Sequence, residues 1–232
     1  MLAFARAYPQ ATFIQIGSND GLQQDPLHDA IQKSAWSGVM VEPVPYVFER
    51  LFNRYNTCER LALENVAISQ EEGVMPFYHL PQASPDEELP SWYDGLGSFS
   101  REILLRHAKF IPDIESRIVC SEVPCLTFES LCSKHDIKTV DVLHIDTEGY
   151  DFEIIKQIDF STLKPRLVIY EHHHLSSTDR KQCMLLLQSA GYDLNEEGLD
   201  TWGVQSQLLS ERLWKKWGRL KARRQRLLES FA

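Results

Sequence analysis

The sequence contains no run of about 18 uncharged apolar residues, the length that a membrane-spanning helix requires. Its first residues, MLAFARAYPQ, lack the long apolar stretch and the small-residue cleavage site of a secretory signal. The five cysteines form no CxxC pair, and an odd number in 232 residues does not indicate a disulfide framework. Internal repeats are also absent. We therefore expect one main domain in a cytoplasmic protein with reduced thiols.

Positive charge is scarce outside the last 22 residues. The whole chain has a net charge of −9, but residues 211–232 hold eight basic and two acidic side chains. The tail is thus +6 and the remainder −15. Because nucleic-acid binding needs a basic surface to neutralise phosphates, the acidic body argues against nucleic acid as a partner.

Short β-rich runs alternate with helical stretches along most of the chain, which favours a mainly parallel sheet covered by helices. The fold class is therefore α/β. The predicted strands are residues 12–16, 39–42, 63–68, 140–146 and 166–171, and segments 192–198 and 200–206 are expected to form an antiparallel hairpin. The predicted helices are residues 26–35, 45–54, 99–107, 127–135, 150–158 and 178–190.

Two regions depart from this alternation. Residues 73–125 include the Pro-rich, acidic piece LPQASPDEELP and the turn DGLGS, and we interpret them as an insertion beside the active site. Its Trp92 and Tyr93 suit either a substrate lid or a satellite core. The main domain then spans residues 1–210, and residues 211–232 are predicted to form a basic helix. Such a helix suits contact with a membrane surface, an acidic glycan or nucleic acid. It equally suits docking on the domain or homo-oligomer formation.

The segment FIQIGSNDG places a glycine-bounded loop directly after the first strand. Gly17 and Gly21 allow a tight turn and a close approach to a ligand. The loop does not match the GxGxxG pattern of dinucleotide sites, and it offers polar side chains at Asn19 and Asp20. Asp20 also suits the cap of a following helix. The loop thus indicates a ligand at the carboxyl end of the strand.

Glu42 ends the second strand, 21 residues after Gly21, within VMVEPVP. An acidic side chain at this position accepts hydrogen bonds from both ribose hydroxyls in dinucleotide sites. Pro43 and Pro45 end the strand and begin a helix, so we expect Glu42 at the rim of the sheet. Together with the preceding loop, Glu42 indicates an adenosine-containing ligand.

Acidic and imidazole groups follow two later strands. Asp146, Glu148 and Asp151 follow the strand in DVLHIDTEGYD, and Glu171 precedes three histidines in LVIYEHHHLS. The carboxyl ends of parallel strands meet at one edge of a sheet, where ligands bind in this fold class. Asp151 also suits the N-terminus of the following helix. We therefore expect catalytic groups at this edge.

These motifs resemble those of FkbM-like methyltransferases. FIQIGSNDG, the glutamate of VEPVP, NVAIS, LTFESLC, HIDTEGYD and PRLVIYEHH occur in the family's order, over about residues 12–176. A departure is His144, where many relatives have lysine. The resemblance implies a class I methyltransferase (Rossmann-like) fold, with a seven-stranded, mainly parallel sheet, one antiparallel strand and helices on both faces.

The resemblance also implies the cofactor S-adenosyl-L-methionine and methylation of a hydroxyl oxygen. The acceptor would be a small molecule or a glycan, such as a sugar or another natural product. The glycine loop would contact the methionine end and Glu42 the ribose, with Asn65 and Val66 beside the adenine and Asp146 and Glu148 beside the methyl group. The expected cofactor-binding residues are Ile16, Gly17, Ser18, Asn19, Gly21, Glu42, Pro43, Asn65, Val66 and Asp146.

Methylation of an aliphatic hydroxyl calls for a general base or a metal ion that stabilises the alkoxide. Our hypothesis is that His172 or His173 acts with Asp146, with Glu148 nearby. An alternative is a divalent cation such as Mg²⁺ bound by Asp146, Glu171 and His172. Two other functions stay open at this point: a catalytically silent, cofactor-binding scaffold and a nicotinamide-dependent oxidoreductase.

Overall fold

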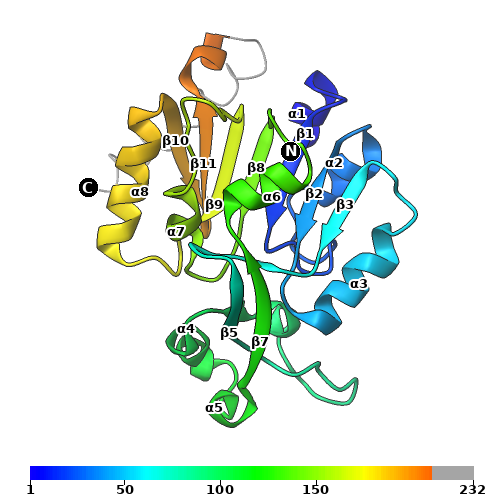
Figure 1. Cartoon of the computed structure of the whole chain (residues 1–232). Helices are drawn as coiled ribbons and strands as arrows, with labels where there is room; N and C mark the ends of the chain where they lie inside the picture. The colour runs from blue at the N-terminus through cyan, green and yellow to red at the C-terminus, as the bar shows by residue number, and fades with distance from the viewer. Residues whose placement is uncertain (211–232) are drawn as a thin grey trace, which may run out of the picture.

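The computed structural model describes residues 1–210, and the predicted basic helix at residues 211–232 lies outside the described residues. Figure 1 shows a large sheet flanked by helices, with a smaller layer built on β5 and β7 at one edge. Within residues 1–210, no helix has the length and apolar character needed to cross a membrane.

The larger sheet has seven strands in the order β10-β11-β9-β8-β1-β2-β3. The pairings from β9 to β3 are parallel, whereas β11 is antiparallel to both of its neighbours. This arrangement confirms the predicted sheet with one antiparallel strand. The strands are β1 (Thr12–Ile16), β2 (Ser37–Val41), β3 (Leu61–Glu64), β8 (Val142–Ile145), β9 (Leu167–Glu171), β10 (Tyr192–Glu197) and β11 (Asp200–Gln205).

Alternating side chains of the central strands bury both faces of this sheet. On β1, Phe13 packs in one apolar cluster with residues of α1, α2 and α3. Ile14 and Ile16 pack in a second cluster with residues of α6, α7 and α8. Because successive side chains of a strand point to opposite faces, a strand buried on both faces is apolar almost throughout. The helices are α1 (Leu2–Ala7), α2 (His28–Lys33), α3 (Pro45–Tyr55), α6 (Phe128–Lys134), α7 (Asp151–Ile155) and α8 (Ser177–Ser189).

The strand predicted at residues 63–68 is broken in the structure. β3 ends at Glu64, and β4 (Ala67–Ile68) pairs with β7 in a different sheet. The Asn65 amide lies at this break, where its Nδ2 donates to the carbonyl oxygens of Glu42 (2.8 Å) and Pro43 (3.1 Å). These hydrogen bonds fix the chain at the point where it leaves the large sheet.

The insertion forms, together with β4, a second sheet that the sequence pattern does not predict. Its order is β4-β7-β5-β6, and the long antiparallel pair of β5 and β7 forms its centre. Pro76 and Pro124 lie inside these two strands. Because proline donates no ladder hydrogen bond, it argues against a strand when the sequence alone is read. The elements are β5 (Gly73–His79), η1 (Tyr93–Gly95), β6 (Gly97–Ser98), α4 (Arg101–Leu105), η2 (Arg106–Lys109), α5 (Ile114–Arg117) and β7 (Val119–Leu126).

The insertion has a small core of its own. Leu80, Tyr93, Leu96 and Leu104 are buried together there. The Ser98 hydroxyl donates to the carbonyl of Glu148 (2.8 Å), which fixes the insertion to the loop after β8. The insertion is therefore a packed layer against the edge of the large sheet where β8 ends.

Replacing Leu143 by alanine should destabilise the protein by about 2–5 kcal/mol, because the side chain is fully buried in the central strand β8. Leu185→Ala is the matched control, since Leu185 is 55% exposed on α8 and should cost less than about 0.5 kcal/mol. Urea unfolding followed by circular dichroism measures both free energies of unfolding. If both variants lost the same free energy of unfolding, the assignment of Leu143 to the core would be contradicted.

Candidate functional site

The loop after β1 approaches the end of β8 so closely that only glycine fits at its first position. A Cβ on Gly17 would lie 1.7 Å from the carbonyl oxygen of Asp146, and Gly17 has a φ of +77°. Asn19 also has a positive φ, of +48°. The amide nitrogens of Gly17 and Ser18 donate to the carbonyl of Val41 at the end of β2. The loop is therefore held against both neighbouring strands.

Glu42 lies at the end of β2 and is 6% exposed. Its Oε2 accepts from the Asn19 amide (3.0 Å) and its Oε1 from the Val44 amide (2.9 Å). Burial raises the pKa of Glu42 to about 7, although these hydrogen bonds favour the carboxylate. Two fixed oxygens with further lone pairs form a suitable acceptor for a pair of vicinal hydroxyls.

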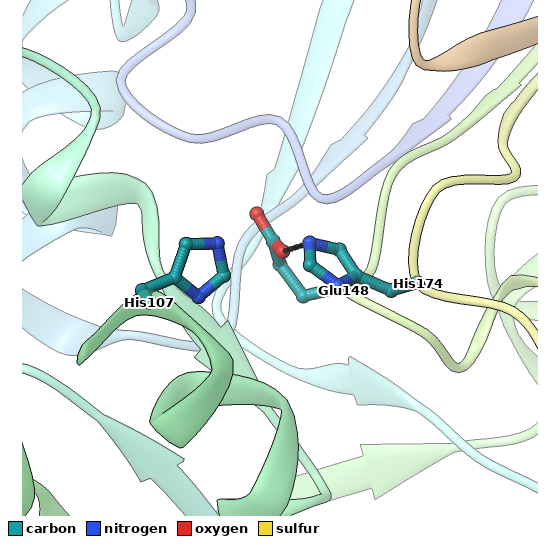
Figure 2. A group of neighbouring side chains, drawn as sticks. All are labelled: His107, Glu148 and His174. Carbon is teal, nitrogen blue, oxygen red and sulfur yellow. Dashed lines mark ion pairs between the residues drawn. The ribbon is translucent and has the colours of Figure 1, made fainter. Parts of the chain in front are cut away.

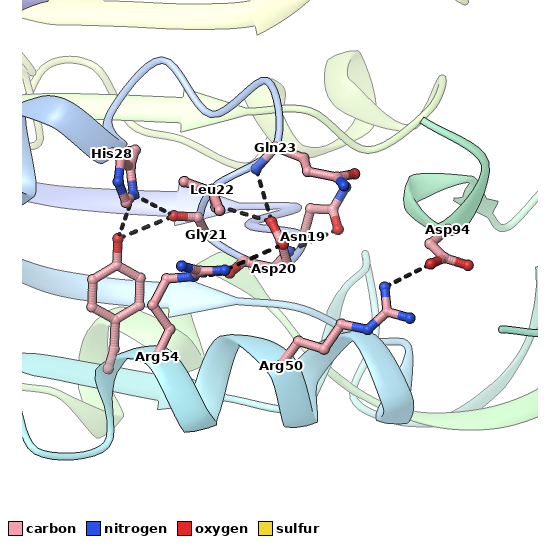
Figure 3. Close-up of polar contacts among 10 residues, drawn as sticks. Asn19, Asp20, Gly21, Leu22, Gln23, His28, Arg50, Arg54 and Asp94 are labelled. Carbon is pink, nitrogen blue, oxygen red and sulfur yellow. Dashed lines mark hydrogen bonds and ion pairs between the residues drawn. The ribbon is translucent and has the colours of Figure 1, made fainter. Parts of the chain in front are cut away.

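The second half of the loop is structural (Figure 3). Asp20 accepts from the amides of Leu22 and Gln23, both at 2.9 Å, and its carbonyl accepts from Arg54 (2.9 Å). The carbonyl of Gly21 accepts from the Tyr55 hydroxyl (3.1 Å). Asp20 therefore caps a turn and not the following helix, because α2 begins only at His28 and has no side-chain cap. Gly21 serves the turn against α3.

A cavity lies at the carboxyl ends of β1, β2 and β8. The predicted site residues that line it are Ile16, Gly17, Ser18, Asn19, Glu42, Pro43, Val66, Asp146 and Glu148. The predicted site residues outside its lining are Gly21, Asn65, Glu171, His172 and His173. The structure therefore brings most of the expected cofactor residues to one cavity, and it assigns Gly21 and Asn65 to support of the backbone.

Residues of the insertion cover one side of this cavity. Trp92, Gly95 and Phe99 line it, and a Cβ on Gly95 would lie 2.4 Å from the Asn19 amide nitrogen Nδ2. Arg50 of α3 forms an ion pair with Asp94 (2.6 Å; Figure 3), which fastens this part of the insertion to the large domain. Trp92 thus lines the site, while its ring also packs against His107 and Phe110.

A group of buried acceptors lining the cavity was not predicted from the sequence. Gln15 and His144 are adjacent in register on β1 and β8, and Gln15 Nε2 donates to Asp25 Oδ1 (2.9 Å). Gln15 Oε1, Asp25 Oδ2 and His144 Nδ1 are buried without a hydrogen-bond partner among residues 1–210. Burial lowers the pKa of His144 to about 4 and so keeps its ring neutral. These atoms together suit a positively charged donor from a ligand.

Carboxyl groups gather where β8 and β9 end. Oxygens of Asp146, Glu148 and Glu171 lie within 4.8 Å of one another. Burial raises the pKa of Asp146 well above its usual value, that of Glu148 to about 7 and that of Glu171 to about 11. Asp151 is fully buried behind them and accepts from the Thr147 hydroxyl (3.0 Å) and the Glu171 amide (3.2 Å), so it joins the two strand ends. Such a crowded acidic group is stabilised by a bound cation.

The consecutive histidines after β9 face different surroundings. His172 is buried, with Nδ1 at 2.9 Å from the Thr201 hydroxyl, and His173 is exposed. Neither lines the cavity, so the geometry does not support either as the base that assists Asp146. Asp146 and Glu171 come together as the metal hypothesis requires, but His172 is in neither potential metal-binding group of residues 1–210.

His174 is the histidine that joins the carboxyl groups. Its Nε2 lies 2.9 Å from Glu148 Oε2, and His107 of the insertion stands on the other side of this carboxylate (Figure 2). Burial lowers the pKa of His174 to about 4 and also lowers that of His107. His107 could not be chosen from the sequence, because it lies in the insertion, 67 residues before His174, and belongs to no motif near it.

Solved structures of methyltransferases resemble this fold. Methyltransferase FkbM from Methylobacillus flagellatus KT matches with a TM-score of 0.53 at 11% identity, over 84% of this chain and 44% of that chain. A SAM-dependent O-methyltransferase from Thermotoga maritima matches with a TM-score of 0.43 at 9% identity, over 88% and 63% of the two chains. The chain thus spans less than half of the first of these structures, and the likeness concerns the fold alone. No curated protein matches the sequence.

The sequence also matches a family model described as the methyltransferase FkbM domain. The match covers residues 15–194, which include the loop after β1, Glu42, the whole insertion and the acidic ends of β8 and β9. It extends over well more than half of the 232 residues and agrees with the class I methyltransferase fold. The chain therefore belongs to the FkbM methyltransferase family.

Proposed function

We propose that the protein transfers the methyl group of S-adenosyl-L-methionine to a hydroxyl oxygen of a sugar, a glycan or a related natural product. The observation that carries this proposal is the Glu42 carboxylate, fixed by two backbone amides and lining the same cavity as Gly17 and Asp146. Membership of the methyltransferase family supplies the reaction class.

The cavity offers complementary groups for each part of this cofactor. Glu42 accepts from the two ribose hydroxyls, and Val66 and Ile68 provide apolar surface for the adenine. The partnerless acceptors of Gln15, Asp25 and His144 bind the ammonium of the methionine moiety. A neutral His144 in place of a lysine leaves this part of the cavity without a competing cation.

When bound, S-adenosylmethionine supplies a methyl group made electrophilic by a sulfonium sulfur. Asp146 and Glu148 follow β8 and line the cavity. A carboxyl oxygen of either residue accepts a hydrogen bond from the acceptor hydroxyl and so orients it. With the cofactor bound, Asp146 would accept the proton that the hydroxyl loses when its oxygen gains the methyl group, and S-adenosylhomocysteine would leave. A neighbouring positive charge, such as that of the bound cofactor, would lower the raised pKa of Asp146 and so favour its role as a proton acceptor.

The acidic surroundings also favour a particular kind of acceptor. The lining of the cavity within residues 1–210 contains no lysine or arginine for an anionic acceptor, and Asp146 and Glu148 offer several hydrogen-bonding oxygens at the cavity wall. Trp92 and Phe99 add flat apolar surface from the insertion. A neutral, hydroxyl-rich acceptor satisfies both features, which is the reason for preferring a sugar or glycan.

The affinity for S-adenosylhomocysteine should rise with pH through about 7. Glu42 loses its proton over this range and then accepts from both ribose hydroxyls. Glu42→Gln should weaken binding about 10-fold or more at pH 8 and remove this pH dependence. Isothermal titration across pH 6 to pH 8.5 measures both effects, and unchanged affinity in the variant would rule out this ribose contact.

Asp25→Asn should weaken S-adenosylhomocysteine binding by about 10-fold or more, because an amide NH₂ replaces an acceptor of the ammonium. Binding of 5′-methylthioadenosine, which lacks the amino-acid end, should change little. Asp29→Asn on the exposed side of α2 is the matched control and should bind both ligands normally. If Asp25→Asn lost the same amount of affinity for both ligands, Asp25 would not contact the ammonium group.

The protein should be incubated with methyl-labelled S-adenosylmethionine and a panel of neutral sugars and glycans. We expect a methyl ether product whose labelled methyl carbon is bonded to oxygen. Asp146→Asn should lower kcat about 100-fold while S-adenosylhomocysteine still binds. Magnetic resonance of the product identifies the methylated atom. A labelled methyl group bonded to nitrogen or carbon would refute O-methylation. Full turnover by Asp146→Asn would refute the role of Asp146 as proton acceptor.

A further inference from the structure

His107, Glu148 and His174 converge from three separate segments of the chain. His107 belongs to η2 of the insertion, Glu148 to the loop after β8, and His174 to the turn after β9. One ligand atom from each lies within 4.8 Å of the other two. In Figure 2 the carboxylate of Glu148 stands between the two imidazole rings. Two imidazoles and one carboxylate are a common ligand set for catalytic divalent metals.

Contacts around the rings hold them in this arrangement. His107 Nδ1 lies 3.2 Å from the carbonyl of Ile103, which is one turn earlier in the chain, and this leaves Nε2 with its lone pair available. Metal-binding histidines commonly donate their other ring nitrogen to a backbone carbonyl in this way. Arg106, next to His107, donates to the carbonyl of His174 (3.3 Å) and so connects the two histidine-bearing segments.

The backbone at Glu148 is held in an unusual conformation. Glu148 has a φ of +51° and is followed by Gly149 with a φ of +97°. A left-handed conformation is costly for a residue with a side chain, and such strain clusters at functional sites. The carbonyl of Glu148 accepts from Ser98 of the insertion, so the segment that carries His107 also fixes the loop of Glu148.

A buried carboxyl group beside the cluster gives an independent indication of a cation. Glu171 is 6% exposed, and its Oε2 has no hydrogen-bond partner among residues 1–210. Its Oε1 lies 3.9 Å from His174 Nε2, and its side chain is within 4.8 Å of Glu148 and Asp146. The ion pairs that the described residues form with Glu148 and Glu171 involve only the ring of His174. Within residues 1–210, these carboxyl groups are therefore left without a lysine or arginine partner.

We propose that His107, Glu148 and His174 bind one divalent transition-metal ion, such as Zn²⁺, and leave a coordination position open toward the cavity that Glu148 lines. A metal with bonds of about 2.0–2.2 Å holds its ligand atoms roughly 3–4 Å apart, so small side-chain rotations complete the site. Imidazole nitrogens favour zinc, iron or nickel over Mg²⁺, which prefers oxygen ligands.

This ligand set replaces the one that the sequence suggested. His174 and His107 take the place of His172, whose ring is bonded to Thr201. Metal binding does not require the methyl-transfer reaction. Only the role of the open position, which is to receive the acceptor oxygen, rests on the proposed function.

Metal binding is tested with the full chain after removal of metals by EDTA. Isothermal titration with Zn²⁺ should show one tight site, and Mg²⁺ should bind far more weakly. Co²⁺ should produce visible absorption bands of a site with nitrogen ligands. A wild-type protein that is folded by circular dichroism but binds no stoichiometric Zn²⁺ would overturn the proposal.

Variants assign the ligands. His107→Ala, His174→Ala and the near-isosteric Glu148→Gln should each weaken Zn²⁺ binding by at least about 100-fold and abolish the Co²⁺ bands. His135→Ala is the matched control, because His135 also forms a pair with a carboxylate, that of Glu64 (2.7 Å), but lies in neither potential metal site; it should bind Zn²⁺ normally. Equal binding by Glu148→Gln and wild type, or an equal loss in His135→Ala, would contradict this site.

Titration of S-adenosylhomocysteine into the same metal-free samples separates the two proposals. If the protein binds S-adenosylhomocysteine normally but binds no Zn²⁺, the metal centre is refuted and the cofactor site stands. A Zn²⁺ site without binding of S-adenosylhomocysteine would refute the proposed cofactor site and leave the metal centre standing.

Discussion

The parallel pairing of β1 with β2 and β8 is the constraint on which the site depends. It continues past the strand ends, where the amides of Gly17, Glu42 and Asp146 donate to the carbonyls of Val41, Glu64 and Ile16. Side chains far apart in sequence therefore meet at one edge. The approach of Gly17 to Asp146 leaves no room for a Cβ, so the geometry of this edge is set by backbone contacts before any ligand binds.

Several carboxyl groups gather at this edge of the sheet. Buried carboxyl groups without cationic partners destabilise a fold when they ionise, and they are retained where a ligand compensates them. Glu171 is buried beside the partly buried Asp146 and Glu148, and Asp25 lies in a separate set of unpaired acceptors. The two groups can serve different cations, an ammonium near Asp25 and a metal ion held by Glu148. The insertion completes both the cavity and the proposed metal ligand set, through Trp92 and His107.

The sequence predicts the large sheet well because its strands are short apolar runs followed by chemically distinctive residues. Gly17, Glu42 and Asp146 each stand at a strand end, so their convergence follows from the fold class. The second sheet escapes prediction because Pro76 and Pro124 interrupt its strand pattern. His107 could not be predicted for another reason, since its partners belong to other segments and only tertiary packing brings them together. The run of three histidines after Glu171 likewise does not indicate which ring faces the carboxyl groups.

The most direct test of the cofactor site is a crystal structure of the protein with S-adenosylhomocysteine. The account predicts that both ribose hydroxyls donate to the carboxylate of Glu42, that the ammonium lies among Gln15, Asp25 and His144, and that the sulfur faces Asp146. A ligand bound outside this cavity, or bound with its ribose away from Glu42, would contradict the central claim.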